Sequence, residues 1–239
     1  DKHIVLTRTE TVNKGKSDNG IERSHTITYT ITATHGPHGT IIGEMVAPMW
    51  EGKGEIRRSF IGKRTPPMPT RPDLSRVKFG APITLFNGKN LDGWRIINPD
   101  QPNGFKAVDG ILVTDPVQPE NGDHLYYGNL RTDREFEDFN LKLEVNIPEE
   151  NNSGVYLRGL YEIQVYDSYQ KKLDPHHMGA LYSRITPSVS AEKPHDTWQT
   201  LDITLCDRHV TVILNGITII YNKPVLGPTG GAISSDVLA

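Results

Sequence analysis

The sequence predicts an all-β protein that forms a two-sheet β-sandwich preceded by a small β-meander segment. Apolar and polar residues alternate with a period of two in many short segments, which is the pattern of strands with one buried face. Gly, Pro and Asn-Gly turn signals separate these segments, and no window shows a helical period of useful length. A length of 239 residues with 36% hydrophobic residues is sufficient for a core of this kind.

Residues 1–62 are predicted to form the meander. The clearest strand is 25–32, in which isoleucine and tyrosine alternate with threonine. The other strands are expected at 4–11, 40–47 and 54–61, with turn signals at Asn19-Gly20, Gly36-Pro37 and Gly52-Lys53-Gly54. This small β segment is consistent with the end of a preceding β domain.

A proline-rich linker is predicted at 63–80. It contains four prolines within seven residues, namely Pro66, Pro67, Pro69 and Pro72. Proline favours an extended chain and cannot occupy a central strand, so we expect a spacer here. The remaining residues, 81–239, are predicted to form the larger domain.

The larger domain is expected to consist of many short strands. The strongest signal is the hairpin 208–221, because Asn215-Gly216 favours a two-residue turn. The full set of expected strands is 83–86, 104–108, 110–114, 124–127, 139–147, 154–158, 160–168, 179–185, 198–206, 208–214 and 217–221.

Composition and charge exclude several classes of protein. A net charge of −3 and a pI near 6.3 give no general attraction to nucleic acid or to an anionic membrane. The apolar stretches are too short to span a bilayer. The single Cys206 excludes an internal disulfide and is expected to be an inert small residue. Because Asp1 is not a natural start, we expect that a signal peptide, a tag or a longer N-terminal region precedes it.

Residues 140–168 place polar side chains on one face of successive strands. Lys142 and Glu144 alternate with apolar residues in the first strand, and the next strand directs Tyr156 and Arg158 to the polar face. Glu162, Gln164 and Tyr166 alternate in the third strand. Aromatic rings and hydrogen-bonding groups on a sheet suit sugars, which offer hydroxyl edges and apolar C–H faces. A solvated outer sheet face is the alternative interpretation.

Five motifs follow one another along the larger domain. They are Leu85-Phe-Asn-Gly-Lys-Asn-Leu-Asp-Gly-Trp94, Asn152-Ser-Gly-Val-Tyr-Leu-Arg-Gly159, Tyr161-Glu-Ile-Gln-Val-Tyr-Asp-Ser168, Gly179-Ala-Leu-Tyr182 and Trp198-Gln-Thr-Leu-Asp202. Together they resemble the motifs of one bacterial family, the 3-keto-disaccharide hydrolases. The resemblance covers residues 82–239, and residues 1–62 look like the small β domain that precedes this module in some members.

The resemblance implies a concanavalin A-like, laminin-G-like sandwich (jelly roll) that acts on a small-molecule or oligosaccharide substrate. It implies no cofactor and no metal, and a periplasmic or secreted bacterial enzyme; the sequence gives no indication of the oligomeric state. Family members continue past the Gly-Pro-Thr-Gly-Gly-Ala232 stretch, so we expect this chain to lack the last strand.

The implied reaction is cleavage of a glycoside that is already oxidised to a ketone at C3. The ketone acidifies the C2 proton, so a base removes it and the substituent leaves C1 by elimination. The outcome is either this elimination or, where water then adds back, a net hydrolysis, and the sequence does not distinguish the two. Such a site needs a base near C2, a partner for the enolate oxygen and an acid for the leaving group. It does not need the paired carboxylates of ordinary glycosidases.

The residue types then suggest roles. Glu162 is the expected base or hydroxyl anchor and Arg158 the partner of the enolate, while His177 titrates near neutral pH and suits proton transfer. The candidate catalytic residues are Arg158, Glu162 and His177, and the candidate substrate-binding residues are Glu144, Gln164, Tyr166, Asp167, Tyr182 and Lys142.

Each of these roles has a structural alternative. Arg158 also suits a salt bridge to Glu144 or Glu162, and Tyr182 suits the core. The neighbouring His176 is expected to be an exposed bystander, and the Pro-His-His loop that carries His176 and His177 also suits a metal site. A non-catalytic carbohydrate-binding module is the main alternative function, and a hydrolase of unoxidised glycans and a structural surface domain are two others. Gln164 occupies the place of a second carboxylate, which argues against the hydrolase of unoxidised glycans.

Overall fold

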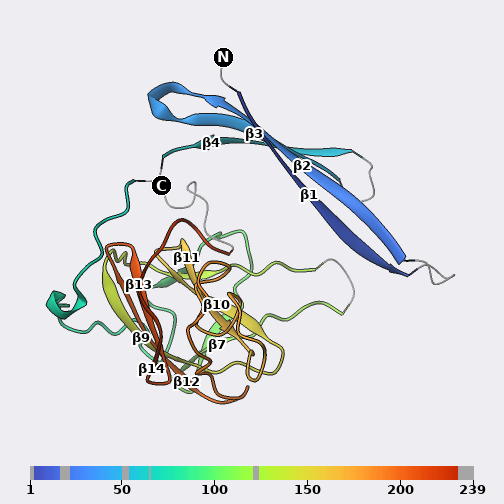
Figure 1. Cartoon of the computed structure of the whole chain (residues 1–239). Coiled ribbons are helices and arrows are strands. Elements are labelled where there is room, and N and C mark those ends of the chain that lie inside the picture. The colour runs from blue at the N-terminus through green and yellow to red at the C-terminus, as the bar shows by residue number, and fades with distance from the viewer. Residues whose placement is uncertain (1–2, 17–21, 50–53, 65, 121–123, 231–239) are drawn as a thin grey trace. The chain divides into compact units, whose positions relative to one another are not determined.

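Four long antiparallel strands form the N-terminal sheet (Figure 1). The computed structural model describes residues 3–16, 22–49, 54–64, 66–120 and 124–230. The strands are β1 (His3–Lys16), β2 (Glu22–His35), β3 (Ile41–Pro48) and β4 (Glu55–Gly62), and they pair in the order β1-β2-β3-β4, as predicted for a meander. The predicted turn at Gly36-Pro37 is confirmed as a short 3₁₀ turn, η1 (Pro37–Gly39), whereas Asn19-Gly20 and Gly52-Lys53 lie outside the described residues.

The chain divides into two compact units, Asp1–Pro67 and Met68–Ala239. The boundary falls within the proline-rich segment, so most of that segment belongs to the second unit. There, the carboxylate of Asp73 accepts a hydrogen bond from the backbone N–H of Ser75 (3.1 Å) and begins a 3₁₀ turn, η3 (Leu74–Arg76). The carbonyl of Pro72 accepts a hydrogen bond from the side-chain amide of Asn222 (2.9 Å), which anchors the segment to the second unit.

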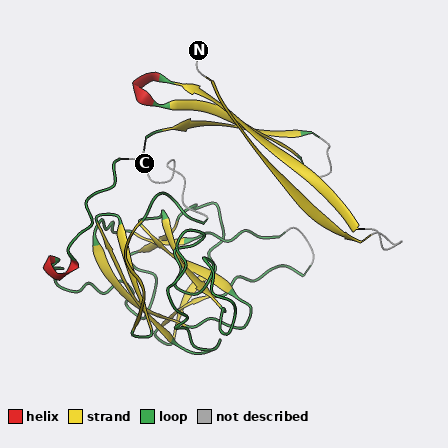
Figure 2. Cartoon of the chain, in the orientation of Figure 1, coloured by secondary structure: helices red, strands yellow, loops and turns green. Residues whose placement is uncertain are grey.

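The second unit consists of antiparallel sheets joined by long loops, and the described residues contain no α-helix (Figure 2). One four-stranded sheet has the order β14-β13-β12-β9, and the two-stranded sheets are β10-β11, β5-β8 and β6-β7. The strands are β5 (Trp94–Ile96), β6 (Phe105–Val108), β7 (Ile111–Thr114), β8 (Leu130–Thr132), β9 (Phe139–Val145), β10 (Asn152–Leu157), β11 (Tyr161–Tyr166), β12 (Gln199–Cys206), β13 (His209–Leu214) and β14 (Ile217–Pro224).

One apolar core joins the β10-β11 sheet to the four-stranded sheet. Ile163 and Val165 of β11 belong to the same buried cluster as Ile203 of β12 and Val212 of β13. These residues alternate with polar neighbours along their strands, so the period-two pattern buries one face and leaves the other available. The core therefore packs against one face of the β10-β11 hairpin, and the side chains of the other face form the candidate site.

Most expected strands of the second unit are present, and the Asn215-Gly216 turn is confirmed. Both turn residues have positive φ (50° and 81°), as a two-residue hairpin turn requires. The strands expected at 83–86 and 124–127 are wrong, because side-chain hydrogen bonds and not strand pairing hold these segments. Trp94 Nε1 donates to the Leu85 carbonyl (2.7 Å), and the Tyr127 hydroxyl donates to the Val117 carbonyl (2.6 Å).

Two further expectations have a mixed outcome. The strand expected at 179–185 is reduced to isolated bridges of Leu181 with Ile163 and with Ile185. Cys206 is buried, and burial together with the nearby Asp138 carboxylate raises the pKa of its thiol, which is consistent with an unreactive residue.

None of the described helical segments is long and apolar enough to cross a membrane. The C-terminal residues 231–239, on which the expectation of a lacking last strand depends, lie outside the described residues.

Candidate functional site

The polar face of the β10-β11 hairpin gathers the side chains of the candidate site. In the antiparallel register, Tyr156 lies opposite Glu162, Gly154 opposite Gln164, and Asn152 opposite Tyr166. Because side chains alternate along both strands, all of these point to the face away from the core. The predicted common face of Glu162, Gln164 and Tyr166 is confirmed by their positions along two adjoining pockets.

Glu162 lies at the centre of the first pocket, which has a volume of about 360 Å³. The side chain is only 9% exposed, and its Oε2 accepts a hydrogen bond from the Tyr156 hydroxyl (2.7 Å). The backbone N–H of Glu162 donates to Thr229 Oγ1 (2.7 Å), so the C-terminal segment fixes the strand from the other side. Asn152, Tyr182 and Gly230 complete the lining.

Two glycines make room for the Glu162 carboxylate. A Cβ atom at Gly154 would lie 2.9 Å from Glu162 Cγ and 3.0 Å from Cδ, and one at Gly230 would lie 2.6 Å from the Tyr156 hydroxyl. These distances are shorter than normal contacts, so a side chain at either position would displace the pair. Gly154 and Gly230 therefore leave open the space that the Glu162 carboxylate occupies.

The second pocket adjoins the first, because Asn152 and Tyr182 line both. Its volume is about 320 Å³, and the chain between β11 and Ser183 encloses it. The other lining residues are Gln164, Tyr166, Ser168, Lys171, Lys172, Asp174, His176 and His177. The two pockets therefore form one cleft with an acidic compartment at Glu162 and a compartment that carries two lysines.

Two contacts organise the side chains of the second pocket. Lys171 Nζ donates to the Tyr166 hydroxyl (2.9 Å) and lies 4.3 Å from the centre of its ring. The hydrogen bond with Tyr166 raises the pKa of Lys171, so this lysine is positively charged at neutral pH. The rings of His176 and Tyr182 meet edge to face at 4.9 Å, and His176 Nε2 lies 2.9 Å from Ser183 Oγ.

Gln164 presents a polar group that has no partner. Its side chain is 2% exposed, and its Oε1 makes no hydrogen bond within the described part of the chain. Exchanging the amide oxygen and nitrogen of Gln164 would put an N–H donor at this position, and the exchange would not supply an acceptor for that donor. A buried polar atom of this kind costs free energy unless a bound molecule satisfies it.

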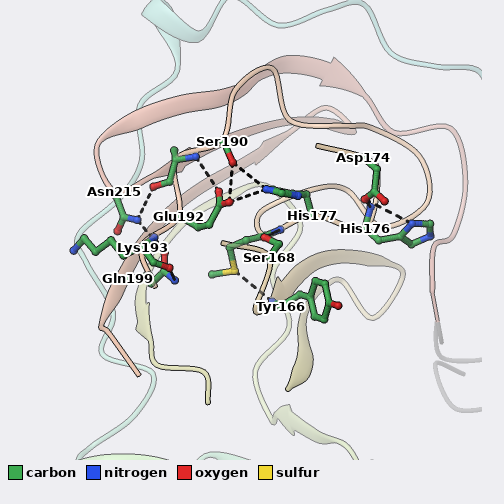
Figure 3. A network of polar contacts seen from close by, with 12 residues as sticks. Tyr166, Ser168, Asp174, His176, His177, Ser190, Glu192, Lys193, Gln199 and Asn215 are labelled. Carbon is green, nitrogen blue, oxygen red and sulfur yellow. Dashed lines mark hydrogen bonds and ion pairs between the residues drawn. The ribbon is translucent and has the colours of Figure 1, made fainter. Parts of the chain in front are cut away.

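His177 is buried, lines the second pocket and belongs to a hydrogen-bonded network (Figure 3). Its Nε2 lies 2.7 Å from Glu192 Oε1 and 3.0 Å from Ser190 Oγ, and Ser190 Oγ also donates to Glu192. The exposed position expected for His176 is confirmed, whereas the Nε2 of His177 is committed to this network. His177 therefore joins the 174–182 loop to the 186–192 loop.

The sequence analysis missed Ser190 and Glu192. They lie in an irregular loop in which no periodicity marks a face, and their contact with His177 spans 13 and 15 positions in the chain. The available signal was the presence of a glutamate in a Ser-Ala-Glu sequence of low hydrophobicity, which does not specify a partner.

Arg158 does not lie on the polar face of a strand. β10 ends at Leu157 and pairs with β11 across a three-residue turn, 158–160, in which Arg158 and Gly159 have φ values of 55° and 66°. The predicted placement is wrong because the turn interrupts the alternation before Arg158. The residue lines neither pocket, and the described residues include no ion pair of Arg158 with Glu144 or Glu162.

Lys142 and Glu144 lie on a different sheet from Glu162. β9 pairs with β12, where Lys142 is opposite Asp202 and forms a salt bridge with it, and Glu144 is opposite Thr200. The structure does not bring these two residues into the cleft. Alternation correctly identifies the outward face of β9, but it does not determine which sheet the strand joins.

Asp167 has a structural position at the end of β11. It is 8% exposed, and its Oδ2 accepts a hydrogen bond from the backbone N–H of Glu150 (3.0 Å) in the loop before β10. The carboxylate closes that loop and lines neither pocket. The described residues also contain no group of three or more His, Cys, Asp or Glu side chains arranged to hold a metal ion.

The fold and the cleft define an all-β protein with a polar, tyrosine-lined cleft on a sheet face. The family described as the 3-keto-alpha-glucoside-1,2-lyase-like domain matches residues 81–234, and the chain belongs to this family. The resemblance of the sequence motifs is thereby confirmed.

Comparison with solved structures finds similar chains from Parabacteroides distasonis ATCC 8503. Two crystal structures, each described as a "putative glycosyl hydrolase", both have a TM-score of 0.48. One is 21% identical over 57% of this chain and 70% of its own, and the other is 27% identical over 62% and 68%. The comparison with curated proteins finds no match to this chain.

Proposed function

We propose that this protein cleaves 3-keto-glycosides by removing the C2 proton and expelling the substituent at C1. The observation that carries the proposal is the Glu162–Tyr156 pair, a nearly buried carboxylate with a hydroxyl partner in a cleft of a 3-keto-glucoside lyase-like domain. Geometry of this kind suits a general base held in one position.

The chemistry balances without a co-reactant other than water. Glu162 takes the C2 proton, and the electron pair of the C2–H bond forms the enolate of the C3 ketone. The enolate then re-forms the ketone as a C1–C2 double bond forms and the C1–O bond breaks, and the departing oxygen receives a proton. Addition of water across C1–C2 gives the free 3-keto sugar and a net hydrolysis.

The residues around Glu162 supply the remaining functions. The Tyr156 hydroxyl orients the carboxylate, and the Asn152 amide and the Tyr182 hydroxyl line the same pocket as hydrogen-bond donors for the enolate oxygen. The proposal assigns no step to Arg158, which lines neither pocket. His177 positions the loop that carries Tyr182.

The test compares a 3-keto-glucoside with its unoxidised parent. Wild-type protein releases the aglycone from the keto substrate only, and E162Q lowers kcat by about 10²- to 10⁴-fold, the usual contribution of a general base. E144Q is the matched control, because Glu144 lies on the other sheet, and it retains wild-type activity. Release from the parent glycoside, or full activity of E162Q, would overturn the proposal.

A carbohydrate-binding module is the second candidate, and one observation favours it. Tyr156, Tyr166 and Tyr182 line the cleft, and such rings bind sugar faces without any catalysis. This function predicts that folded wild-type protein binds the keto glycoside without turnover and that E162Q binds it equally well.

We further propose that the two core sheets are the layers of a concanavalin A-like sandwich and that the protein is periplasmic or secreted. The shared core of the β10-β11 and β14-β13-β12-β9 sheets supports the sandwich. An experimental structure tests the layer arrangement, and cell fractionation tests the location.

A further inference from the structure

We propose that the lysine-bearing pocket is the subsite for the departing group and that it selects a departing group with a carboxylate, such as a uronic acid. This inference rests on the proposed function, because it assumes that the keto sugar occupies the Glu162 pocket. It adds a second subsite and a substrate class.

The shared lining of the pockets gives the first argument. Asn152 and Tyr182 border both pockets, so a group bonded to C1 of a sugar at Glu162 can extend directly into the neighbouring compartment. That compartment, with a volume of about 320 Å³, belongs to the size class of small-molecule sites.

The unpartnered amide of Gln164 gives the second argument. Gln164 lines the second pocket, and its Oε1 is buried and makes no hydrogen bond among the described residues. A hydroxyl of the departing group is a suitable donor for it. The site is thus built to hold a polar ligand, because without one the acceptor stays unsatisfied.

The charge of the second pocket identifies the ligand class. Lys171 is held by Tyr166, whereas Lys172 makes no hydrogen bond or ion pair within the described residues. Asp174 is the carboxylate that lines this pocket, and it is occupied by the backbone N–H of His176 (2.8 Å), with the ring Nδ1 of His176 at 3.9 Å. The carboxylates of Asp167 and Glu150 also act on Lys171. Lys172 is therefore the ammonium group of this pocket that is available to pair with an anionic ligand.

The binding test uses methyl glucuronide and methyl glucoside as matched probes, measured by NMR titration at low salt. Wild-type protein binds the glucuronide about tenfold more tightly, and K172Q reduces this preference about tenfold. K223Q is the charge-matched control, because Lys223 is exposed on β14 and lines neither pocket, and it leaves the preference unchanged. Equal affinities for the two probes, or an equal effect of both variants, would overturn the proposal.

The turnover test separates this proposal from the function on which it rests. The substrates are 3-keto-glucosides with a carboxylated or a neutral departing group, and the readout is the ratio of their kcat/KM values. A ratio above about ten that falls in K172Q supports the subsite. Turnover with a ratio of one overturns the subsite and leaves the function standing. Glucuronide binding without turnover of either substrate overturns the function and leaves an anion site.

Discussion

The position of the Glu162 carboxylate is tested by placing a methyl group at Gly154. The backbone of Gly154 has no positive φ, so alanine fits the strand, but its Cβ would lie 2.9 Å from Glu162 Cγ and 3.0 Å from Cδ. Carbon atoms normally approach to about 3.5–4.0 Å, so the side chain must retreat by about 0.5–1 Å. A displacement of about 1 Å in an active site costs about a hundredfold in rate, so we expect G154A to lower kcat/KM by about 10- to 100-fold.

The assay is steady-state release of the aglycone from a 3-keto-glucoside, with thermal unfolding recorded for each variant. G80A is the matched control, because a Cβ at Gly80 meets nothing within 4 Å, and it keeps both activity and stability. G154A retains a cooperative unfolding transition, since the strain falls on one side chain. A kcat/KM of G154A within twofold of wild type would refute the claim that activity requires the Glu162 carboxylate in the position that Gly154 leaves open.

Two further predictions concern stability. E192A lowers the free energy of unfolding by about 2–4 kcal/mol, because it removes the buried carboxylate that both His177 and Ser190 contact. E149A at an exposed site changes this free energy little, and urea unfolding measures both variants. Burial alone would raise the pKa of Asp202, but the hydrogen bonds from Lys142 and Asn140 and the charge of Lys142 together outweigh burial and lower the pKa. The Lys142–Asp202 pair therefore stabilises the fold above a pH of about 3.8, the pKa of the aspartate in the unfolded chain. The free energy of unfolding of wild type exceeds that of D202N by at most about 1 kcal/mol there, and this difference disappears as the pH falls through the lower pKa of Asp202 in the folded protein.

Local patterns predicted the strand faces well. The alternation of Glu162, Gln164 and Tyr166 and the turn at Asn215-Gly216 depend only on neighbouring residues, and the structure confirms both. The turn at Arg158 could also have been predicted, because a three-residue connection that contains glycine, between two alternating segments, is typical of a hairpin.

Long-range contacts were beyond the same patterns. The pairing of β9 with β12 places Lys142 beside Asp202, 60 positions away, and no local feature of β9 specifies this partner. The unexpected contact of His177 with Glu192 has the same origin, because an irregular loop returns to the site without a periodic signal. The site was therefore predicted where it follows one hairpin and missed where it depends on loops.

The measurement that tests the central claim most directly is proton NMR of a 3-keto-glucoside incubated with the protein in D2O. The account predicts that the wild type releases the aglycone with deuterium entering C2, or with an unsaturated 3-keto product, and that E162Q shows neither. Because proton abstraction at C2 is the step assigned to Glu162, aglycone release with the original C2 proton retained would contradict the account.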